Sequence, residues 1–152
     1  MDGRPVGDER RSRGSAPASR RCALILVDTS VWVETFRRAR PLDLGSLLDF
    51  DDVVTCLPVI QEVLQGFRDE NAFRLARESM AALPIIEAPL GLAAVEEAAN
   101  LFRLARKAGL TVRSSTDCLI AACAIRNDAE VLHRDRDFAV LARVSSLRAR
   151  AV

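Results

Sequence analysis

Short apolar runs alternate along the chain with longer segments in which apolar side chains recur every three or four positions. The runs are typical of strands, and the first has no polar alternation, as expected of a strand buried on both faces of a parallel sheet. Strands are predicted at residues 23–27, 52–56, 84–87, 130–132 and 144–147, the last at an edge. This alternation predicts a three-layer α/β fold with a central, mainly parallel sheet flanked by helices.

Proline, glycine and hydroxyl residues mark where the intervening helices begin and end. Pro58 is placed as a first-turn proline, Gly109 ends the longest helix, and Ser115 or Thr116 caps the next one. That next helix is apolar on nearly every side, which predicts a buried central position. Helices are expected at about residues 29–38, 58–67, 71–83, 92–108, 117–126 and 137–142, with a short one from Pro41 through Leu48.

Length and composition indicate one globular domain. The chain has 152 residues and a mass of 16.7 kDa, with 49% hydrophobic and 28% charged residues. Residues 1–22 are rich in Gly, Pro, Ser and Arg, and we expect a disordered extension or a misassigned start there rather than an RNA-binding arm. Residues 23–152 are then the functional domain, and they are slightly acidic.

Residue counts exclude several chemistries. The chain has no Tyr and a single His, His133, to which we assign no catalytic role. No glycine-rich sequence precedes its one lysine, Lys107, so a Walker phosphate loop is absent. The four cysteines contain no Cys-x-x-Cys pair and are expected to be reduced, buried thiols. No apolar run reaches the length of a membrane span, and we expect a cytoplasmic protein without a membrane partner.

Acidic residues stand where ligands bind in parallel sheets, at the carboxyl ends of strands. Asp28 follows the first strand directly, Asp135 and Asp137 follow the strand at residues 130–132, Asp117 opens the apolar helix, and Glu62 lies early in the helix opened by Pro58. Clustered carboxylates repel one another unless a cation joins them. Oxygen ligands without His or Cys favour Mg²⁺ or Mn²⁺.

Four motifs in this order resemble those of the PIN domain, and the best match within it is the VapC toxin family of bacterial toxin–antitoxin pairs. The likeness covers about residues 22–147. The motifs are Leu-Ile-Leu-Val-Asp28-Thr29-Ser30, Glu62 in Gln-Glu-Val-Leu-Gln-Gly, Ser-Thr116-Asp117-Cys-Leu-Ile-Ala-Ala, and His-Arg-Asp135-Arg-Asp137-Phe.

The resemblance implies a Mg²⁺-dependent endoribonuclease, with Mn²⁺ as a substitute. It would hydrolyse RNA, with tRNA or rRNA as the expected substrate, to leave 5′-phosphate and 3′-hydroxyl ends and inhibit translation and growth. The implied catalytic residues are Asp28, Glu62, Asp117 and Asp135. Asp28, Asp117 and Asp135 would bind metal, with Glu62 and Asp137 as further candidate ligands, and Thr29, Ser30 and Thr116 would support them.

The alternatives concern single residues and the class of protein. Asp28 and Asp117 could be helix N-caps only, and Asp137 could be a supporting ligand or a cap. The arginines, Arg113 and Arg134 among them, are expected to be mainly solvated, with a subset near the pocket. The resemblance further implies a VapB-type antitoxin, whose groove the helix with Trp32 and Val33 would help to form, and a homodimer. The competing function is a catalytically silent PIN-like scaffold that binds RNA or protein.

Overall fold

The computed structural model describes residues 23–152, in which five parallel strands form one sheet. The central strand β1 (Ile25–Val27) pairs with β2 and β4, so that Leu26 lies opposite Val54 and Val131. The strand order is β3-β2-β1-β4-β5, with β2 at Val53–Cys56, β3 at Ile85–Ile86, β4 at Glu130–His133 and β5 at Arg148–Ala151. All carboxyl ends therefore meet at one edge of the sheet.

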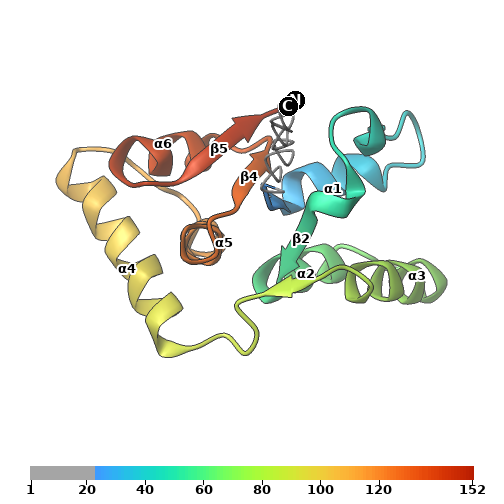
Figure 1. Cartoon of the computed structure of the whole chain (residues 1–152). Helices are drawn as coiled ribbons and strands as arrows, with labels where there is room; N and C mark the ends of the chain where they lie inside the picture. Colours follow the sequence, from blue (N-terminus) through green and yellow to red (C-terminus); the bar gives the residue numbers. More distant parts are fainter. Residues whose placement is uncertain (1–22) are drawn as a thin grey trace, which may run out of the picture.

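Two groups of helices cover the sheet. One group packs around α2, and the other packs around α5, with the strands between them (Figure 1). The first group is α1 (Thr29–Thr35), α2 (Leu57–Gln65) and α3 (Glu70–Ala81), and the second is α4 (Leu92–Lys107), α5 (Ser115–Arg126) and α6 (Arg136–Val144). The predicted three-layer α/β fold is confirmed.

Helix α5 is the buried centre that its composition predicts. Its residues Ile120 to Ala124 are fully buried, and α4 and α6 pack against it. Three of these five residues are alanines, so the neighbouring elements can approach the helix closely. Within residues 23–152, none of the helices combines the length and the apolar character needed to cross a bilayer.

Two predicted elements are wrong. The segment from Pro41 to Leu48 holds a single 3-10 turn, Leu44–Ser46, because a short stretch containing Gly45 does not propagate a helix; a second turn, Phe50–Asp52, follows. The edge strand lies at Arg148–Ala151 rather than at residues 144–147, since Val144 ends α6 and the buried Leu147 packs into the core.

The edge strand escaped prediction because backbone pairing, and not an apolar face, places it. Residues 148–151 pair with β4 along their whole length, and the Arg150 Nε lies 3.3 Å from the Glu130 Oε2. Helix α1 is also shorter than predicted and ends at Thr35. The predictions for residues 1–22 fall outside the described residues.

Packing around α5 generates a stability prediction. Replacing the fully buried Ala122 by Leu inserts methylene groups into a filled core, and we expect the free energy of unfolding to fall by about 1 to 3 kcal/mol. Urea denaturation measures the change. The control Ala93→Leu adds the same volume at an exposed position of α4 and should leave the stability nearly unchanged; equal effects at both positions would contradict the packing described.

Candidate active site

Asp28 has the first of the two roles that its position suggested, since it is the N-cap of α1. It caps α1 with one oxygen, Oδ2, which accepts a hydrogen bond from the Ser30 backbone N–H at 2.9 Å and another from the Ser30 hydroxyl. The other oxygen, Oδ1, is buried and has no hydrogen-bond partner among the described residues. Its side chain therefore offers one uncommitted oxygen beside the end of β1.

Glu62 reaches the same place from α2. Its Oε2 accepts a hydrogen bond of 2.8 Å from the hydroxyl of Thr29, the residue that follows Asp28. This bond joins the beginning of α1 to the second turn of α2 across 33 positions of the chain. Thr29 thus fixes the direction of the Glu62 carboxylate.

Asp117 completes the set from the first turn of α5. Its backbone N–H donates to the Ser114 Oγ, which caps the helix, and the residue is 7% exposed. Its Oδ2 is buried without a partner among residues 23–152. Burial, followed by repulsion from Asp28 and Asp135, raises the pKa of Asp117 to about 7, and burial also raises the pKa of Asp28.

The carboxylates of Asp28, Glu62 and Asp117 can each place an oxygen so that all three lie within 4.8 Å of one another. Asp117 also forms such a group with Asp135 and Asp137. Two buried carboxylate oxygens without donors are costly unless a cation approaches them. The oxygen donors and their unmet charge therefore fit a divalent cation such as Mg²⁺ or Mn²⁺.

Asp135 and Asp137 differ in what they contact. Asp135 caps α6 and accepts the Asp137 backbone N–H at 3.0 Å. Asp137 is fully buried, and its Oδ2 accepts the backbone N–H groups of Arg113 and Ser114 at 2.7 and 3.1 Å. Asp137 therefore holds the segment that leads into α5, on which Asp117 stands.

Arg113 is one of the arginines expected to be mainly solvated, with a subset near the pocket, and the structure places it against two carboxylates of the cluster. Its Nη2 lies 2.7 Å from the Asp135 Oδ1, and its Nε lies 3.2 Å from the Asp137 Oδ1. Arg113 looks like any other arginine of the chain, and its partners come 22 and 24 positions later, so no local signal could have found it.

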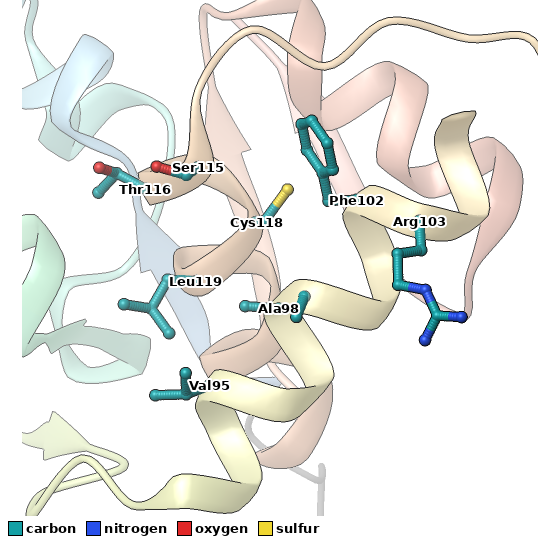
Figure 2. Close-up of a pocket in the computed structure, with 9 residues that line it drawn as sticks. Val95, Ala98, Phe102, Arg103, Ser115, Thr116, Cys118 and Leu119 are labelled. Carbon is teal, nitrogen blue, oxygen red and sulfur yellow. The ribbon is translucent and has the colours of Figure 1, made fainter. Parts of the chain in front are cut away.

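The hydroxyls proposed to support the site divide into two sets. Thr29 and Ser30 bond to Glu62 and Asp28, and the Ser30 Oγ also accepts the Arg134 backbone N–H at 3.0 Å. Thr116 has no hydrogen bond to a carboxylate among the described residues. Together with Ser115 it lies at one end of an apolar groove of about 530 Å³ between α4 and α5, lined also by Val95, Phe102, Cys118 and Leu119 (Figure 2).

His133, for which no catalytic role is predicted from the sequence, packs in the core. It is 4% exposed, and its ring lies 5.3 Å from that of Phe138. Burial lowers the pKa of His133, which favours the neutral form in the core.

The PIN domain family model matches residues 25–144 of this chain. The chain is 40% identical over 131 residues to "Ribonuclease VapC11" of Mycobacterium tuberculosis strain H37Rv, which covers 83% of this chain and 97% of that protein. "VapC ribonuclease Mb1587" of Mycobacterium bovis gives the same values. The chain therefore belongs to the PIN domain family and, within it, to the VapC ribonucleases, as the motifs predicted.

Solved structures agree with this assignment. The VapBC-5 structure from Mycobacterium tuberculosis, a member of the VapBC family of toxin–antitoxin systems, superposes with a TM-score of 0.65 and 26% identity, covering 86% of this chain and 99% of that one. DNA-bound VapBC from Salmonella typhimurium gives a TM-score of 0.68 at 14% identity, covering 85% and 98%, and this likeness shows the fold.

The raised pKa of Asp117 generates a prediction for the metal-free protein. Between the ordinary value of 3.8 and about 7, the folded chain binds more protons at this carboxyl than the unfolded chain does. The contribution of Asp117 to the free energy of unfolding therefore falls as the pH rises through this window. We expect Asp117→Asn to become increasingly more stable than the wild type up to about pH 7, as measured by urea denaturation with chelator.

The matched control is Asp128→Asn, since the Asp128 side chain is 93% exposed. Its stability relative to the wild type should vary little over the same pH range. A difference between Asp117→Asn and the wild type that stays constant with pH would contradict the assignment.

Proposed function

We propose that the protein is a Mg²⁺-dependent endoribonuclease and the toxin component of a type II toxin–antitoxin pair, with Mn²⁺ able to replace Mg²⁺. The observation that carries the proposal is the convergence of Asp28, Glu62 and Asp117, in which two buried oxygens lack a donor among the described residues. Its curated relatives carry the name ribonuclease, which supports the same activity.

The residues of this site would divide the work of hydrolysis. The ion would be held by Asp28 Oδ1, Asp117 Oδ2 and one oxygen of Glu62. Ser30 keeps the Asp28 carboxylate in place, and Thr29 keeps the Glu62 carboxylate in place. When bound, a divalent cation lowers the pKa of water and stabilises the charge that develops on a phosphodiester. The carboxylates would orient water for in-line attack, which leaves 5′-phosphate and 3′-hydroxyl ends on RNA, with tRNA or rRNA as substrate.

A silent scaffold that binds without cleaving is not favoured. A binding module has no need of partnerless carboxylate oxygens at the end of β1, because they weaken the fold when no cation is present. Two further expectations belong to the proposal: the toxin acts in the cytoplasm, and it forms a homodimer.

The first prediction of the proposal concerns cleavage. Losing a group that merely supports a metal ligand typically costs 10- to 100-fold in activity, so we expect Asp28→Asn or Asp117→Asn to lower cleavage by about 100-fold or more. The measurement is purified protein with cellular RNA and Mg²⁺, with sequencing of new 5′-phosphate ends. Chelator should abolish the same cuts.

Asp128→Asn is again the control, because it removes an exposed carboxylate outside the cluster and should cleave at the wild-type rate. Cleavage that persists in both cluster variants, or in chelator, would refute the metal-dependent mechanism.

A VapB-type antitoxin is the second part of the proposal. The first two helices form a small apolar notch of about 190 Å³, lined by Val33, Phe36, Val63 and Phe67, in which Phe36 packs against Trp32 and Phe67 with ring distances of 5.7 Å. Trp32 itself is buried, whereas Val33 is 50% exposed. An apolar segment of the antitoxin would cover this notch.

We therefore expect Val33→Asp to weaken antitoxin binding by roughly 10-fold or more, since it places a charge where an apolar contact forms. Calorimetry with the cognate antitoxin tests this, and RNA cleavage without antitoxin should be unchanged. Val95→Asp is the matched control, because Val95 is 48% exposed on α4, in the other groove. Loss of binding in Val95→Asp alone would place the antitoxin on α4 and α5 instead.

A further inference from the structure

Arg113 is part of the acidic cluster. Its guanidinium spans Asp135 and Asp137, with contacts of 2.7 and 3.2 Å to one oxygen of each. The Asp137 side chain is 1% exposed, so its charge has little water around it. A guanidinium stays charged at every physiological pH, and its planar fork suits two carboxylates at once.

Hydrogen bonds already engage three of the four oxygens of this carboxylate pair. The Asp137 Oδ2 accepts two backbone N–H groups, and its Oδ1 accepts the Arg113 Nε. The Asp135 Oδ1 accepts the Arg113 Nη2 and the Asp137 backbone N–H. Only the Asp135 Oδ2 has no such bond among the described residues.

The other half of the cluster has the opposite character. Asp28 and Asp117 are 3% and 7% exposed, and no described residue donates a hydrogen bond to the buried Asp28 Oδ1 or Asp117 Oδ2. No arginine or lysine forms an ion pair with Asp28, Glu62 or Asp117 in residues 23–152. The negative charge that lacks a partner is therefore concentrated at these three carboxylates.

We infer, on the basis of the proposed function, that Arg113 takes the place of a second cation between Asp135 and Asp137. Each chain then binds one divalent ion, at Asp28, Glu62 and Asp117. Asp135 does not ligate that ion but helps to hold the Arg113 guanidinium in place. Removing the guanidinium leaves the Asp137 Oδ1 without a hydrogen bond and leaves the Asp135 Oδ1 with only the bond from the Asp137 backbone N–H. Asp117, Asp135 and Asp137, whose oxygens can lie within 4.8 Å of one another, then form a second site.

Mn²⁺ titration of the full-length protein tests the inference, with free Mn²⁺ followed by electron paramagnetic resonance and heats by calorimetry. We expect one ion per chain in the wild type and two in Arg113→Gln, the second binding more weakly. Arg113→Lys keeps the positive charge and should still bind one. Arg148→Gln is the matched control, because the Arg148 side chain on β5 is 49% exposed, as is that of Arg113, and pairs with Asp128, outside the cluster.

A second pair of variants keeps the test independent of how Arg113→Gln folds. Asp135→Asn should change the Mn²⁺ dissociation constant by less than about 3-fold, whereas Asp28→Asn should raise it by about 10-fold or more. Two ions in the wild type, one ion in a folded Arg113→Gln, or a large loss of affinity in Asp135→Asn would overturn the role of Arg113 alone. A wild type that binds no Mn²⁺ would overturn the proposed function with it.

Discussion

Repulsion among carboxylates at one edge of the sheet is the constraint on which this site depends. The parallel topology brings five carboxylates to the carboxyl ends of the strands: Asp28, Glu62, Asp117, Asp135 and Asp137. Asp28, Asp117 and Asp137 are buried, so these three have lost much of the water that would screen them. Burial, with a smaller contribution from repulsion between carboxylates, raises the pKa values of Asp28 and Asp117, and these shifts reflect the cost of ionising them in the folded chain. Hydrogen bonds and the Arg113 ion pairs offset this cost at some of the carboxylates, and a cation would offset it at the others.

The helix N-termini supply the first part of this compensation. Asp28 and Asp135 cap α1 and α6, and Asp117 lies in the first turn of α5, where the partial positive charge of the helix end favours an anion. Capping and ligand binding do not exclude each other, because a carboxylate has two oxygens. Asp28 shows this most clearly, since one oxygen caps the helix and the other has no donor.

Much of the fold was predictable because apolar runs and helical spacing report burial directly. The central strands and α5 followed from that signal, whereas β5 did not, since an edge strand with Arg148 and Arg150 is placed by backbone pairing to β4. The acidic positions could be named from strand ends and from the resemblance. Their grouping into two halves could not, because it depends on which backbone N–H groups and which arginine reach each carboxylate.

The two halves of the cluster differ in the positive charge that would offset the repulsion between carboxylates. At Asp135 and Asp137 that charge is Arg113, and at Asp28, Glu62 and Asp117 it would be a bound cation. Arg113 belongs to the chain and cannot leave, so Asp137 keeps its bonds to the segment before α5 whether or not an ion is bound. Asp117 on α5 is thereby held in position beforehand, which is what an electrostatically preorganised site requires. In the proposed mechanism, an exchangeable ion would be needed only at Asp28, Glu62 and Asp117, where the fold leaves buried oxygens of Asp28 and Asp117 without donors among the described residues. In that mechanism the fixed charge of Arg113 maintains the shape of the site, and the charge of the exchangeable ion would be available for the chemistry.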